Sequence, residues 1–158
     1  MELIDAINAV RDTLRDNLID PYVTAGGNSR NGLWVFTDEP DAGAKYPRIQ
    51  IKKFDNIIEP ITIGSNFTEE EVLLLNVWFF SKNNFKLTVG GTVYKNDQLV
   101  DYYLGRIKNT LKSKMPDKVS DGIKGYKAVS TSPVEYDPET QLHYANVTIS
   151  VKYYNVGC

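Results

Sequence analysis

The segment EEEVLLLNVWFF, residues 69–80, constrains the fold of this 158-residue chain more than any other segment. Side chains alternate between the two faces of a β-strand, and here both sets are apolar. One set is Val72, Leu74, Trp78 and Phe80, and the other is Leu73, Leu75, Val77 and Phe79. A strand of this kind usually lies between two covering layers. The rest of the chain must therefore cover one face, and something must also cover the second.

Two segments have the spacing of amphipathic helices. Residues 2–19 repeat apolar side chains at steps of three and four. This helix ends at Asp20, because the residue before a proline is pushed out of helical geometry. Residues 97–114 repeat the pattern up to Met115-Pro116. The apolar stripes are Leu3, Ile7, Val10, Leu14 and Leu18 in the first helix, and Leu99, Val100, Tyr103, Leu104, Ile107 and Leu111 in the second.

Most other regular segments have the patterns of antiparallel strands. YPRIQIKKF, residues 46–54, alternates, and a connection marked by proline and glycine leads from it to the strand near 70–80. FKLTVGGTVYKN, residues 85–96, predicts a hairpin that turns at Gly90-Gly91. Residues 126–136 and 142–155 form a closing pair joined by Asp137-Pro138-Glu139-Thr140. The order predicts one α+β domain over residues 1–158, a mainly antiparallel sheet with the two amphipathic helices packed on one face.

Residues 22–45 have mostly the character of a loop, interrupted by a short strand at 33–36. Loops of this length inside a compact domain are usually binding segments or disordered. Both interpretations stay open.

The sequence offers no catalytic, cofactor or metal site. The single histidine, His143, lies within a predicted strand and is interpreted as a packing residue rather than a base. The single cysteine, Cys158, has no base near it in sequence, and one cysteine cannot form an intrachain disulfide. Carboxylates gather at 38–41 and 69–71 without the spacing of an ion-binding loop. A solvated loop and a charged run before an aggregation-prone strand are the better interpretations. We therefore expect a protein that is not an enzyme and holds no cofactor.

Charge and hydropathy exclude other classes. The net charge of −2 lacks the basic excess expected for nucleic-acid binding. Ten tyrosines and two tryptophans, with Arg48, Lys52 and Lys152 on the polar side of the sheet, keep single-strand binding as an alternative. No apolar run approaches the length of a membrane span. The N-terminus lacks the features of a secretory signal, so we expect synthesis in the cytoplasm.

The second apolar face of residues 70–80 needs a cover. An exposed patch of this size usually marks a contact site. Either the hairpin at 86–94 and the loop with Trp34 cover it, or another subunit does. The predicted subunit contacts are Trp34, Trp78, Phe80, Tyr94 and Tyr154.

The order of short motifs resembles the tail-terminator and neck (head–tail connector) proteins of tailed viruses of bacteria or archaea. The motifs, in order, are the N-terminal amphipathic helix, YPRIQI, NVWFFSKNN, TVGGTVYKNDQLVDYYLGRIKNTL and HYANVTISVKYYN. The resemblance covers nearly the whole chain.

The resemblance implies a structural protein of the virion, located in the tail or neck and assembled in the host cytoplasm. Such subunits form a homo-oligomeric ring, commonly of six copies, through head-to-tail contacts. The ring caps the tail tube and contacts the tail tube protein and neck or connector proteins. DNA passes through its lumen without sequence-specific binding, and no membrane is involved. The long 22–45 loop departs from this pattern and leaves open another head–tail connector component. A monomeric protein-binding assembly module is a further alternative.

Overall fold

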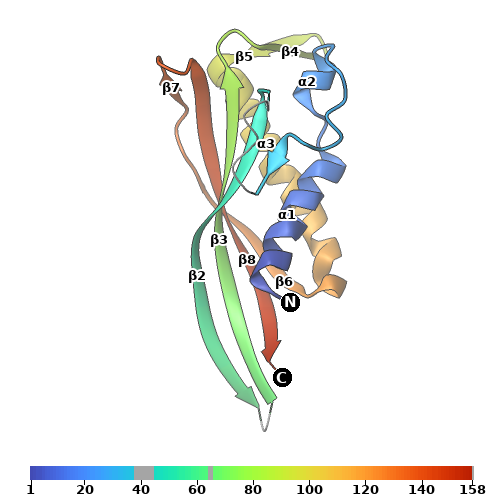
Figure 1. The fold of residues 1–158 in the computed structure, drawn as a ribbon, viewed down its shortest axis with the longest axis vertical. Coiled ribbons are helices and arrows are strands. Elements are labelled where there is room, and N and C mark those ends of the chain that lie inside the picture. Colours follow the sequence, from blue (N-terminus) through green and yellow to red (C-terminus); the bar gives the residue numbers. More distant parts are fainter. Residues whose placement is uncertain (38–44, 64–65, 158) are drawn as a thin grey trace.

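The computed structural model describes residues 1–37, 45–63 and 66–157. A twisted six-stranded sheet carries a layer of helices on one face, with a separate two-stranded hairpin at one end (Figure 1). The helices are α1 (Leu3–Asn17), α2 (Pro21–Thr24), α3 (Asn96–Lys114) and the 3-10 helix η1 (Met115–Asp121). The strands are β1 (Val35–Phe36), β2 (Arg48–Ile63), β3 (Asn66–Lys82), β4 (Lys86–Val89), β5 (Thr92–Lys95), β6 (Ile123–Thr131), β7 (Glu135–Asp137) and β8 (Leu142–Gly157). The predicted α+β class is confirmed.

The large sheet has the strand order β1-β2-β3-β8-β6, and β7 also pairs with β8. All these pairs are antiparallel except that of β1 with β2, which is parallel. The doubly apolar strand β3 therefore lies in the middle of the sheet, hydrogen-bonded on both sides. The far ends of β2 and β3 extend beyond the N-terminal end of α1 (Figure 1).

The core lies between the helices and one face of the sheet. From Leu73 to Phe79 every second residue of β3 is fully buried, and so are the matching residues of β8. The Phe79 ring stacks on Tyr103 of α3 with centroids 4.6 Å apart. The buried sheet residues are Ile49, Ile51, Leu73, Leu75, Val77, Phe79, Ala145, Val147, Ile149, Val151 and Tyr153. Both predicted helical stripes contribute to this core, with Val10, Leu14, Leu99 and Ile107 among its fully buried members.

One polar pair interrupts the apolar character of β3. Asn76 lies opposite Thr148 of β8, and the Thr148 hydroxyl donates to Asn76 Oδ1 at 2.8 Å. Both side chains belong to the face that points away from the helices.

The predicted glycine turn is confirmed. Gly90 and Gly91 join β4 to β5 with φ of 56° and 82°, a conformation that glycine adopts without the steric cost of a Cβ. The hairpin packs on the helix side of the molecule, where Tyr94 stacks on Tyr102 of α3 with ring centroids 4.5 Å apart.

The predicted connection between residues 54 and 70 is wrong. β2 continues to Ile63 and β3 begins at Asn66. Pro60 is compatible with this strand because β2 is at the edge of the sheet over this stretch, and an edge strand tolerates a residue without an N–H group.

Candidate assembly interface

The outer side of β2 is an open sheet edge over most of its length. Within the described residues, β1 pairs with Ile49 and Gln50 only, so beyond them β2 has β3 as its one partner strand. We call residues 53–61 the β2 edge. An unpaired edge of this kind presents free N–H and C=O groups and is a template for pairing with another strand.

The β2 edge is apolar as well as unpaired. Phe54, Ile57 and Ile58 are 65%, 46% and 51% exposed. A β-bulge between Lys53 and Asp55 shifts the register at Phe54. After the bulge, Ile57 lies opposite Val72 on the face away from the helices, whereas Ile58 lies opposite Glu71 on the helix side. Both faces of the edge are therefore apolar, and the exposed acids Asp55 and Glu59 flank them.

The face of the sheet away from the helices, here the open face, carries the second apolar set of β3. Val72, Leu74, Trp78 and Phe80 are half-buried. Trp78, Phe80 and Tyr144 of β8 form an aromatic cluster with ring centroids 5.9 to 6.1 Å apart. The chain's own side chains therefore shelter this face only in part.

The chain's own hairpin and Trp34 do not cover the open face. The hairpin packs on the helix side, and Trp34 lies in the core edge-on to Tyr103, with ring centroids 6.3 Å apart. Of the internal cover considered from the sequence, the hairpin and Trp34 therefore do not lie on the open face, and residues 38–44 of the loop lie outside the described residues.

The five predicted contact residues do not form one surface. Trp34 is 2% exposed and has almost no surface left for a partner. Trp78 and Phe80 lie together on the open face, Tyr94 packs on α3, and Tyr154 is on β8 with the Lys124 ammonium 5.6 Å from its ring centroid. Except for Trp34, these residues stay predicted contacts.

Sequence reasoning missed the β2 edge. Ile57 and Ile58 fall in the predicted connection, and Phe54 is the last residue of the predicted strand 46–54. The available signal was an Ile57-Ile58 pair followed by a single proline, which is compatible with an edge strand as well as with a loop.

A small polar cluster lies next to this edge on the helix side. Glu71, predicted to belong to a charged run before an aggregation-prone strand, is buried opposite Tyr153, and its Oε1 accepts from Asn56 Nδ2 at 3.0 Å. Its Oε2 and the Tyr153 hydroxyl are buried without a well-formed hydrogen bond to a described residue. Burial, and then the neighbouring Glu71, raise the pKa of the Tyr153 phenol above its usual range.

We expect Glu71→Gln to stabilise the protein by about 1 kcal/mol at neutral pH, because burying a carboxylate with half of its hydrogen bonds unmade is costly. The amide keeps the acceptor for Asn56 and adds a donor that can reach Tyr153. Urea unfolding at neutral pH measures the change. Glu69→Gln, one pleat away, is the control, with no expected change. A Glu71→Gln variant less stable than the wild type contradicts the prediction.

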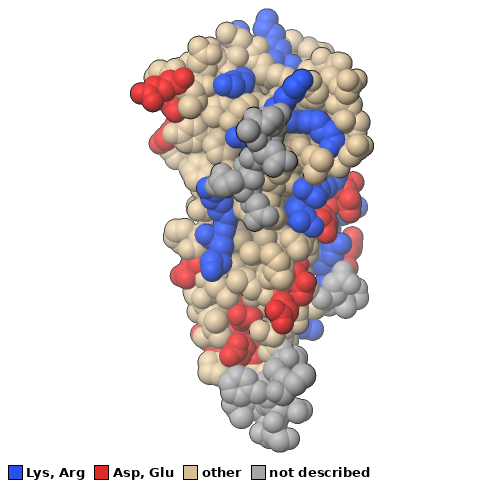
Figure 2. Space-filling view, in the orientation of Figure 1, with Lys and Arg blue, Asp and Glu red and all other residues tan. Residues whose placement is uncertain are grey.

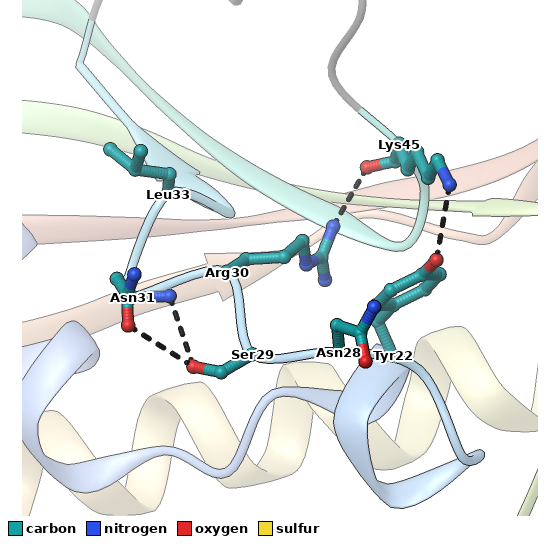
Figure 3. A pocket seen from close by; sticks show the side chains of 7 residues that line it. All are labelled: Tyr22, Asn28, Ser29, Arg30, Asn31, Leu33 and Lys45. Atoms are coloured by element: carbon teal, nitrogen blue, oxygen red, sulfur yellow. Dashed lines mark hydrogen bonds between the residues drawn. The ribbon is translucent and has the colours of Figure 1, made fainter.

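A surface hollow of about 450 Å³ lies beside the first part of the long loop (Figure 3). Arg30 crosses it, donating from Nε to Asp20, from Nη1 to the Lys45 carbonyl oxygen, and from Nη2 to Asp20 and the Pro47 carbonyl oxygen. Each guanidinium nitrogen is thus engaged within the chain. In this hollow Arg30 anchors the loop through hydrogen bonds within the chain, and we do not interpret it as a ligand-binding residue.

The single histidine is held by two side-chain contacts. His143 Nδ1 lies 2.8 Å from Asp97 Oδ1, and Nε2 lies 3.0 Å from Asn83 Oδ1, so both ring nitrogens join β8 to neighbouring segments. No three histidine, cysteine or acidic side chains among the described residues are grouped to hold a metal ion. The acidic run at 38–41 lies outside the described residues. No helix in the described chain is long and apolar enough to cross a membrane.

Comparison with known proteins gives likenesses to solved structures alone. No protein-family model and no curated protein matches the sequence. Among solved structures, a chain from the virion of a native gene transfer agent (GTA) particle aligns with a TM-score of 0.47 and 9% identity, over 97% of this chain and 98% of that chain. A likeness at this level does not carry function over, so the role of the chain is inferred from its own surfaces.

Proposed function

We propose that this protein is a structural subunit of a virion that assembles into a ring, caps a tail tube and joins it to the neck or head. The observation that carries the proposal is the β2 edge, where the outer side of the strand has no partner strand among the described residues and three apolar side chains are exposed. The order of sequence motifs, which resembles tail-terminator and neck proteins, supports the same role. On this proposal the virion is its location, and DNA passes through the lumen of the ring without sequence readout.

The β2 edge supports assembly because, within the described residues, its outer backbone groups have no partner strand and its apolar side chains are exposed. A strand that adds to it gains ladder hydrogen bonds and covers apolar surface worth roughly 25 cal/mol per Å². A single surface that docks on a different surface of the next copy gives head-to-tail contacts. Such contacts close into a ring when the rotation between copies divides a full turn evenly.

We expect Ile58→Asp to abolish rings without unfolding the subunit, because Ile58 is 51% exposed on the β2 edge. Size-exclusion chromatography with light scattering and negative-stain images measures assembly, and circular dichroism checks the fold. Ile4→Asp is the matched control, since Ile4 is 56% exposed on α1. Rings that persist in folded Ile58→Asp remove the β2 edge from the interface.

Two other candidate functions rest on specific features. The same edge suits a foreign strand, which would make the chain a monomeric assembly module or another connector component. A single 17.9 kDa species in light scattering supports the module. Arg48 of β2 lies opposite Phe80 of the aromatic cluster, and its guanidinium carbon is 4.1 Å from the Tyr46 ring centroid. This surface chemistry suits single-stranded nucleic acid, and salt-dependent affinity for an oligonucleotide tests it.

A further inference from the structure

A second apolar surface lies at the opposite end of the molecule from the far end of β2 (Figure 1). It is a groove of about 290 Å³ between the end of α1, β4 and α3. Leu87 and Tyr103 are buried residues of its lining. Ile19 and Val89, also in the lining, are 69% and 38% exposed, and Val23 on nearby α2 is 40% exposed.

The groove follows the side of β4 that has no strand. Residues 87–90 all contribute to its lining although neighbouring side chains of a strand point to opposite faces, so the groove runs along an edge. On its other side β4 pairs with β5, and these two strands form a sheet of their own. The free side of β4 can therefore accept a third strand.

The basic side chains around the groove favour a strand with acidic side chains. Arg106 is the charged residue of the lining and makes no hydrogen bond or ion pair with any described residue. Lys86 and Lys95 are exposed on the hairpin. On the β2 edge, Ile57 and Ile58 lie between the exposed acids Asp55 and Glu59, and Phe54 and the exposed Lys53 precede them. Figure 2 shows acidic side chains gathered over the lower strands, below a band in which Lys and Arg predominate.

We propose that the β2 edge of one copy docks in this groove of a second copy and lies along β4 as a third strand. The two surfaces lie toward opposite ends of the long axis, so they cannot meet within one chain (Figure 1). Both are apolar and both have an unpaired strand side. Asp55 and Glu59 of the β2 edge are opposite in charge to Arg106, Lys86 and Lys95 around the groove. The contact is head-to-tail, joining different surfaces of the two copies. The inference rests on the proposed function and specifies which two surfaces join the copies.

Site-directed crosslinking tests the contact. In a Cys158→Ser background, an Ile58→Cys variant is mixed with a Val89→Cys variant and treated with a short bis-maleimide reagent. We expect a crosslinked dimer of the two variants, more abundant than in either variant alone. Ile4→Cys mixed with Val89→Cys is the control, because Ile4 matches Ile58 in exposure and lies on α1.

A charge exchange tests the same contact in another way. Glu59→Arg, placed in the Ile58→Cys variant, is expected to lower the yield of crosslinked dimer severalfold. Arg106→Glu in the Val89→Cys partner is expected to restore it. A yield no higher than that of the Ile4→Cys control, at millimolar protein or in preparations that contain rings, overturns the inference. If rings form without the crosslink, this contact is wrong and the proposed function is unaffected. If the crosslink forms in open-ended chains of subunits, the contact is supported and a closed ring is contradicted.

Discussion

Replacing Phe79 with alanine is expected to lower the free energy of unfolding by about 3–5 kcal/mol, whereas replacing Phe80 is expected to cost about 1 kcal/mol. Phe79 is fully buried and stacks on Tyr103. The truncation therefore removes the transfer free energy of the ring and leaves a cavity between sheet and helix. Phe80 points to the open face, where it is half-buried beside Trp78.

Urea unfolding of dilute protein, followed by far-UV circular dichroism, measures both changes. The two substitutions are chemically identical and adjacent in sequence, so the difference between them reports which face of β3 is in the core. Equal losses of stability contradict the assignment of the two faces.

Replacing Arg30 with alanine is expected to lower the free energy of unfolding by about 3–5 kcal/mol. The substitution leaves the buried Asp20 carboxylate without its counter-charge. The side chains of Arg30 and Asp20 are only 11% and 10% exposed. The guanidinium also lies 5.0 Å from the Tyr22 ring centroid and 5.8 Å from that of Trp34. Lysine cannot reproduce the planar fork of donors, so Arg30→Lys is expected to recover little of the loss.

Arg11 provides the control for this prediction. Its ion pair with Asp12 is 2.9 Å long, but the two side chains are 25% and 50% exposed. Solvent screening holds such a pair to about 1 kcal/mol or less. Thermal and urea unfolding of both alanine variants compare the two sites. A loss for Arg30→Ala no greater than that for Arg11→Ala shows that the loop is not fastened by this side chain.

The parts of the fold that follow from periodicity could be predicted from the sequence. The two amphipathic helices, the Gly90-Gly91 turn and the doubly apolar β3 each repeat a local pattern, and local patterns fix local structure. The continuation of β2 through residues 55–63 could not be predicted from the sequence, because Pro60 and the bulge at Phe54 interrupt its alternation. Whether they end a strand depends on whether the strand lies at an edge, which is decided by the sheet and not by the segment.

The candidate interface was accessible to sequence reasoning only in part. Excess apolar surface on β3 correctly indicated a face that the helices do not cover. Trp34 is a predicted subunit contact, yet it packs in the core against Arg30 and Tyr103. Contacts of this kind join residues far apart in sequence and leave no periodic signal. The same holds for Glu71, whose burial depends on Asn56 and Tyr153 of the flanking strands.

The Asn76–Thr148 pair contributes to the register of β3 against β8. A strand with one polar and one apolar face is aligned by hydrophobicity, since a slip of one residue would turn its polar side chains inward. On β3 such a slip would exchange one set of apolar side chains for another, Trp78 or Phe80 for Phe79. Correct alignment then depends on the polar alternation of β8 and on the single amide that meets a threonine hydroxyl across the ladder.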